Sequence, residues 1–111
     1  MSVKIERINN ILVQEISYVI NTEVKDDDIK FVTVTAVDAS KDLSYAKVYF
    51  TVLEDTKKET TTKALNNASG FIRSELFDRV DMRNVPELTF VYDESIATGK
   101  HIEDLIKDIH S

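Results

Sequence analysis

The chain has 111 residues, a length that fits one domain with its own hydrophobic core. It contains no cysteine, which excludes disulfide bonds, thiol catalysis and zinc sites built on thiolates, and which fits a reducing cytoplasm. The formal net charge is −6, and this charge alone argues mildly against RNA binding, because nucleic-acid-binding domains are usually basic. No apolar run approaches membrane-spanning length, and the first residues lack the apolar core of a signal peptide.

The first predicted element is an amphipathic helix over residues 3–24. Its apolar residues recur every three or four positions and so share one face. They are Ile5, Ile8, Leu12, Ile16 and Val19, joined by Ile11 and Ile20. Lys4 and Arg7 lie near the start of this helix, where they form either an ordinary solvated helix end or a contact for phosphate groups.

Two strands follow over residues 30–38 and 45–53, and the short turn between them makes the pair antiparallel. In the first strand we expect Val32, Val34 and Ala36 to share one face of the sheet, with Val37 on the other. The second strand alternates between a buried face and an open face that carries tyrosine and lysine. Those side chains could meet RNA, but an ordinary solvated sheet face is the favoured interpretation.

Residues 56–83 show one long helical pattern with a fault in the middle, and Thr56 with Glu59 predicts a capping box at its start. A straight helix of this length would run roughly 40 Å and overhang a domain whose diameter is nearer 35 Å. We therefore predict a kink at residues 68–70, which also exposes the amides of the second half to an anion. The alternative is that Gly70 only lets two helices pack closely.

Pro86 ends the helical pattern, and residues 87–92 form the third predicted strand. A right-handed crossover through the two helices places it parallel to the second strand. A short terminal helix follows, whose apolar stripe packs on the domain or docks on a partner. The stripe comprises Ile102, Leu105, Ile106 and Ile109. The order of elements predicts an α+β fold, with a three-stranded sheet covered by helices on one face.

With this order in hand, the sequence resembles the bacterial ribosome-binding factor A family over nearly its whole length. The matching segments, in chain order, are residues 32–35, 42–50, 64–65, 68–73, 75–76, 83, 85–88, 93, 95, 99, 102 and 105–106. Any one of them would be a weak signal, but their number, order and spacing together are specific. The chain departs from the family at Asp26, Asp27 and Asp28, where relatives commonly have Asp-Pro-Arg, and this bears on any RNA contact by that loop.

The resemblance implies a single type II KH-like RNA-binding domain over residues 1–94, with residues 95–111 as a C-terminal helical segment packed on it or flanking it. The family carries an alanine-any-glycine kink instead of the Gly-x-x-Gly loop of other KH domains, and here the kink is Ala68-Ser69-Gly70. The implied function is a non-catalytic, cytoplasmic and monomeric assembly factor. It would bind the free small (30S) ribosomal subunit and its 16S rRNA, and assist late maturation and rRNA processing.

The expected RNA-binding residues lie at the start of the first helix and around the kink. They are Lys4, Arg7, Lys63, Asn66, Asn67, Ala68, Ser69, Gly70 and Arg73. The lysines and arginines would contact phosphates, and the amides and hydroxyl would add hydrogen bonds. No cofactor, metal, small-molecule substrate or membrane partner is expected.

Two other classes of function compete with this one. An acidic protein-interaction module would dock on a ribosomal protein or another basic partner without touching RNA, and the acidic balance of the chain and its apolar C-terminal stripe suit it. An enzyme would have to use His101 and His110 with nearby carboxylates, but both histidines lie in the terminal segment and no known catalytic motif is present. We therefore expect no catalytic activity.

Overall fold

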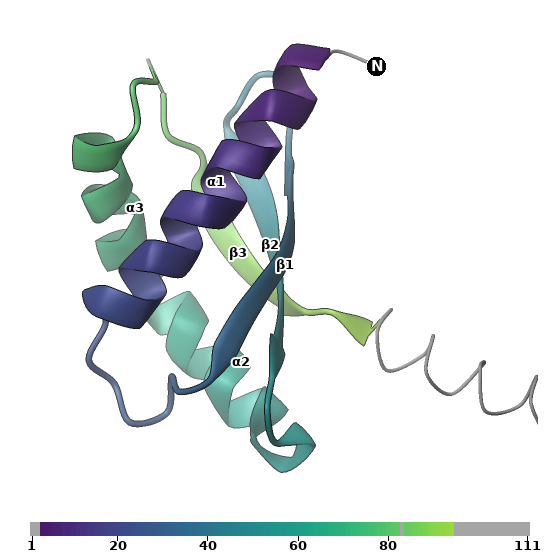
Figure 1. Ribbon diagram of the computed structural model, residues 1–111, viewed down its shortest axis with the longest axis vertical. Coiled ribbons are helices and arrows are strands. Elements are labelled where there is room, and N and C mark those ends of the chain that lie inside the picture. Colours follow the sequence, from purple (N-terminus) through teal and green to yellow (C-terminus); the bar gives the residue numbers. More distant parts are fainter. Residues whose placement is uncertain (1–2, 83, 95–111) are drawn as a thin grey trace, which may run out of the picture.

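The computed structural model describes residues 3–82 and 84–94, and it is an α+β fold, as predicted (Figure 1). In chain order the elements are α1 (Val3–Thr22), β1 (Val32–Ala39), β2 (Tyr45–Val52), the 3₁₀ turn η1 (Asp55–Lys57), α2 (Lys58–Asn67), α3 (Ser69–Arg79) and β3 (Glu87–Tyr92). The sheet has the order β1-β2-β3, with β1 antiparallel and β3 parallel to β2. The three strands and their directions are those expected from the sequence.

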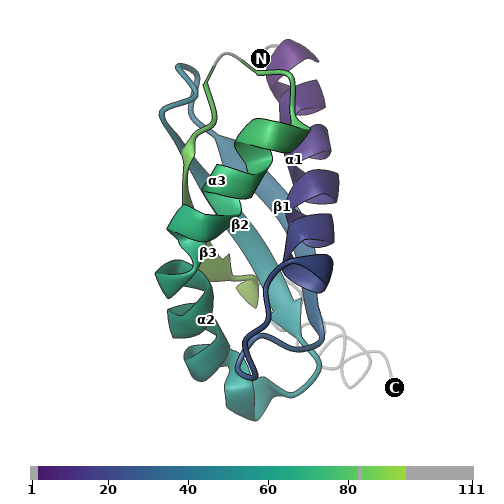
Figure 2. The ribbon, with the colours of Figure 1, turned by 90° about the vertical axis from the view of Figure 1, so that its left-hand side faces the viewer.

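The described helices cover one face of this sheet, and none of them covers the other, open face, as Figures 1 and 2 show from two directions. α1 packs on β1, while α2 and α3 pack on β3. The core between the layers is closed by side chains with no exposed surface, including Leu12, Leu65, Leu76 and Phe50. The ring of Phe50 meets that of Phe90 edge-on at 6.5 Å between centroids.

A bulge in β1 reverses the predicted alternation of buried and exposed side chains in the second half of the strand. Val34 pairs with Phe50, but the next paired residue is Ala36, opposite Tyr49, so Thr35 is an extra residue in the strand. Each bulge shifts the later side chains to the opposite face. Val37 is therefore buried and Ala36 exposed, the reverse of the expectation.

The long helical pattern breaks where the sequence predicted, but its two ends differ from the prediction. The 3₁₀ turn precedes α2, whose N-cap residue is Lys57 and has no side-chain cap bond, so the capping box predicted at Thr56 and Glu59 is wrong. α3 ends at Arg79 and not at residue 83, because Val80 is already extended, with φ −112° and ψ 142°.

The predicted terminal helix, with the apolar stripe and both histidines, lies outside the described residues. Within the described part, no helix is both long enough and apolar enough to cross a membrane.

The side chain of Asn66 ties the end of α2 to the outer edge of β3. Its Nδ2 donates to the backbone oxygen of Phe90 at 3.0 Å and to that of Thr62 at 3.1 Å. Its Oδ1 accepts from the backbone N–H of Phe90 at 2.8 Å. The carboxamide therefore replaces, at one residue, the hydrogen bonds that a further strand would have made.

We predict that Asn66→Ala lowers the free energy of unfolding by about 1–3 kcal/mol, because it leaves the edge groups of Phe90 without their partner. The neighbouring Asn67→Ala is the matched control, since Asn67 is exposed, and it should change stability by less than about 0.5 kcal/mol. Urea denaturation of both variants measures the difference. Equal losses in the two variants would contradict a specific role for Asn66.

Candidate nucleic-acid interface

The residues expected to bind RNA form two groups that the fold keeps apart. Figures 1 and 2 place the junction between α2 and α3 near the level where α1 ends, whereas Lys4 and Arg7 lie at the start of α1. A helix of 20 residues is about 30 Å long, so the two groups cannot contact the same phosphate. The junction is therefore the main candidate site, and the start of α1 is a second one.

The junction is a single-residue interruption of the helix. Ala68 has φ −90° and ψ 0°, and its N–H donates to the oxygens of Ala64 at 3.0 Å and Leu65 at 3.1 Å. The next helix begins at once, with the N–H of Ile72 donating to the oxygen of Ala68 at 3.0 Å. The hydroxyl of Ser69 donates back to the oxygen of Asn66 at 2.8 Å, so it serves the end of α2. No described side chain caps the start of α3, which suits that helix end for an anion.

Gly70 lies in the first turn of α3 in an ordinary helical conformation. No glycine among the described residues has a positive φ, and a Cβ built on Gly70 would meet no atom of the rest of the fold within 4 Å. The alternative that Gly70 lets the two helices pack closely is therefore wrong. A glycine inside a helix costs roughly 0.5–1 kcal/mol relative to alanine. The packing of the fold therefore gives no reason for a glycine at this position.

Three of the candidate residues point into solvent along one side of the helix pair. Lys63 and Asn67 are exposed and one turn apart on α2, and Gly70 follows at the start of α3. This exposed row carries a cation, an amide and an uncovered stretch of backbone. It can supply a phosphate contact, a hydrogen bond and a place for close approach.

Two other candidates already hold the protein together. The carboxamide of Asn66 is already hydrogen-bonded to Phe90 and Thr62, as described above. The Nε of Arg73 donates to the oxygen of Val85 at 2.9 Å, and its guanidinium lies 5.2 Å from the ring centroid of Phe77. The hydrogen bond uses one of the five N–H donors of Arg73, so the arginine is fixed in place while a charged group stays at the surface.

The surroundings of Arg7 are of mixed charge. It lines a groove of about 680 Å³, together with Ile8, Ile11, Asp42, Leu43, Asp81, Met82 and Asn84. The backbone N–H of Ser44 and the hydroxyl of Ser40 lower the pKa of Asp42, so this carboxylate stays charged at neutral pH. Arg7 thus shares its groove with two carboxylates. The side chain of Lys4 lies outside the described part.

The open sheet face is less suited to RNA than the junction. Lys47 is exposed there, but its cross-strand partner is Asp38, and Glu87 is opposite Tyr45.

Sequence reasoning also missed Phe77, which is 49% exposed on α3. Phe77 lies outside the apolar stripe of Ile72 and Leu76, and this spacing could have predicted from the sequence that its ring is exposed.

The described part of the chain offers no site for a metal ion built on histidines and carboxylates. Over residues 3–82 and 84–94, no cluster of three or more histidines and carboxylates could hold a metal ion. His101 and His110 are outside this range.

Comparison with known proteins identifies the family. The family model for ribosome-binding factor A matches residues 4–106. A ribosome-binding factor A from Staphylococcus epidermidis is 47% identical over 110 residues, which cover 98% of this chain and 95% of the relative.

Two structures of relatives share the fold. The crystal structure of ribosome-binding factor A from Thermus thermophilus has a TM-score of 0.73 and 28% identity, over 79% of this chain and 93% of that one. A homology model of the Thermus thermophilus factor, fitted into an electron cryo-microscopy map of a 30S complex, has a TM-score of 0.66 and 29% identity, over 78% of this chain and 91% of that one. From the matched length, the identity and the shared fold, the chain belongs to the ribosome-binding factor A family.

Proposed function

We propose that this protein is a non-catalytic assembly factor that binds the free small (30S) ribosomal subunit and contacts its 16S rRNA. It would act in the cytoplasm as a monomer without a cofactor, and assist late maturation and rRNA processing. Membership of the family supports this proposal, as does the 30S complex in which the Thermus thermophilus relative was fitted.

The observation that best supports an RNA contact at the junction is the open space over Gly70. A residue that costs stability, has an ordinary φ and faces nothing in its own fold fits a surface where another molecule must come close. The start of α3 beside it offers amides to a phosphate. Lys63 and Asn67 extend the same exposed row.

The nine candidate residues then divide into three roles. Lys63, Asn67, Ala68, Ser69 and Gly70 form the contact surface at the junction. Asn66 and Arg73 position it, by holding β3 and the chain before it, and Arg73 adds positive charge. Lys4 and Arg7 form a second contact at the other end of α1. Two separate contacts would fix the orientation of the domain on the subunit.

We expect Lys63→Glu to weaken binding to free small subunits roughly tenfold, because it replaces a phosphate contact with a repulsion. Lys47→Glu is the matched control: it makes the same charge change at an exposed residue of the open sheet face. Cosedimentation with free small subunits and with complete ribosomes, each at two salt concentrations, measures both variants. Equal weakening would show that only the overall charge matters, and would contradict a contact at α2.

Gly70→Ala should separate stability from function. The added methyl group meets open space, so the free energy of unfolding should rise by about 0.5–1 kcal/mol. Affinity for the small subunit should fall several-fold or more, because the methyl group blocks close approach of the RNA backbone. The two measurements are urea denaturation and cosedimentation. An unchanged affinity in the stabilised variant would remove the junction from the interface.

A further inference from the structure

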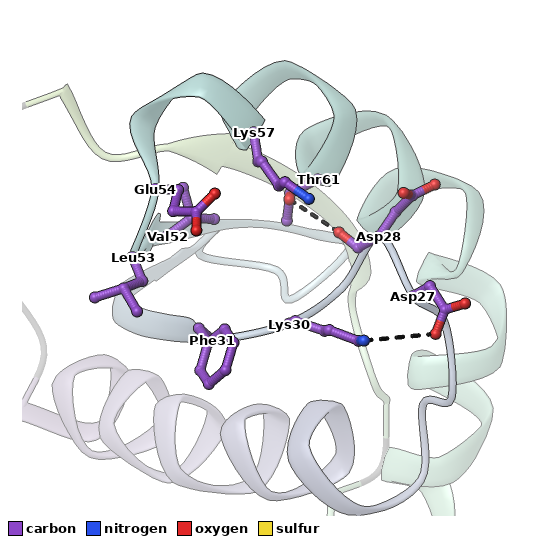
Figure 3. Close-up of a pocket in the computed structure, with 9 residues that line it drawn as sticks. All are labelled: Asp27, Asp28, Lys30, Phe31, Val52, Leu53, Glu54, Lys57 and Thr61. Atoms are coloured by element: carbon purple, nitrogen blue, oxygen red, sulfur yellow. Dashed lines mark hydrogen bonds and ion pairs between the residues drawn. The ribbon is translucent and has the colours of Figure 1, made fainter.

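The two most exposed large apolar side chains of the described residues lie side by side at the far end of α2 from the junction. Phe31 is 73% exposed and Leu53 is 74% exposed. Val32 and Val52 are opposite each other in the sheet. Phe31 directly precedes Val32 and Leu53 directly follows Val52, so the two side chains lie at neighbouring strand ends. Figure 3 shows both lining one pocket of about 80 Å³, which has room for an aliphatic side chain.

The backbone holds Phe31 outward. Its φ is 55°, in the left-handed region that bulky side chains disfavour. The buried side chains of Ile29 and Val32 anchor the chain on either side of it. The buried hydroxyl of Thr61 donates to the oxygen of Asp28 at 2.9 Å and fixes the loop to α2. The exposed ring is therefore presented by an anchored loop and not by a loose one.

Carboxylates lie on both sides of this apolar pair. In Figure 3, Glu54 stands at one end of the pocket and Asp27 with Asp28 at the other. Lys57 and Lys30 also line it, and Lys30 pairs with Asp27 at 3.7 Å. Three carboxylates and two ammonium groups leave a net charge of −1. This net charge favours a cationic ligand over a phosphate backbone.

We propose that the Phe31–Leu53 pocket docks a segment of a basic ribosomal protein on the small subunit. The segment would insert one aliphatic side chain between Phe31 and Leu53, with a lysine or arginine on each side to meet Glu54 and the aspartates. A second copy of this chain is disfavoured because its net charge of −6 opposes the same rim. The proposal rests on the proposed function for its partner, but not on the RNA contact at the junction.

The pocket and the junction can be occupied together. They lie at opposite ends of α2, which at 10 residues is about 15 Å long. The protein contact at the start of α2 and the RNA contact at its end would then anchor the same helix. The three aspartates that depart from the family pattern fall in the loop beside this pocket, which gives them a role other than binding RNA.

The first test is photocrosslinking of the full chain to purified small subunits, with p-benzoylphenylalanine in place of Leu53. We expect a crosslink to a ribosomal protein, at a peptide with an aliphatic residue between lysines or arginines. The same photoreactive residue in place of Asn67, exposed at the junction, should crosslink to RNA. Crosslinks from position 53 to RNA or to a second copy, or none while position 67 reacts, would overturn the pocket proposal alone. A chain that does not bind small subunits would overturn both proposals.

The second test separates docking from folding. Phe31→Gly relieves the left-handed backbone, so its thermal unfolding midpoint should stay the same or rise by a few degrees. Its affinity for the small subunit should nevertheless fall roughly tenfold, as expected for the loss of an aromatic anchor. Tyr45→Ser is the control, because Tyr45 is a 63% exposed aromatic residue on the open sheet face, and its affinity should not change. Equal affinity of Phe31→Gly and the wild-type chain would overturn the proposal.

Discussion

The hydrogen bonds between the Asn66 carboxamide and the backbone of Phe90 are the constraint on which the arrangement of this domain depends. They attach the last turn of α2 to the edge of β3 while Ala68 interrupts the helix. Both helices can then place their apolar side chains, Leu65 and Leu76 among them, against one sheet. The break at Ala68 therefore serves the packing of the two helices on the sheet, and the proposed contact surface lies at the same break.

We infer that the same short segment serves both packing and binding, because its two sides differ. Its inner side is occupied: Asn66 holds β3, Ser69 serves the end of α2, and Arg73 holds the oxygen of Val85. Its outer side is open over Gly70. An external ligand can approach that side without disturbing the packing beneath it. This separation makes it possible to change binding and stability in opposite directions, which a site built from core residues would not permit.

Regular features of the sequence predicted the fold, and local geometry limited the prediction. Periodicity placed α1 and β2, because burial on one face imposes a period on the residues. The break between α2 and α3 was predicted from the length of the helical pattern and from Gly70 inside it. The bulge at Thr35 could not be predicted from the sequence, because one extra residue in a strand leaves no signature in its composition. The roles of Asn66 and Asn67 were also indistinguishable, because only the position of β3 decides which of them meets a partner. The positive φ of Phe31 is likewise a tertiary effect.

Amide hydrogen exchange can test whether the α2–α3 junction contacts the small subunit. Exchange would be compared for the full chain free and bound to purified small subunits. We expect added protection at residues 68–72, where α3 begins, and little change at the exposed residues of the open sheet face. Protection confined to the sheet face, with the junction unchanged, would contradict it and place the RNA contact on the other side of the domain.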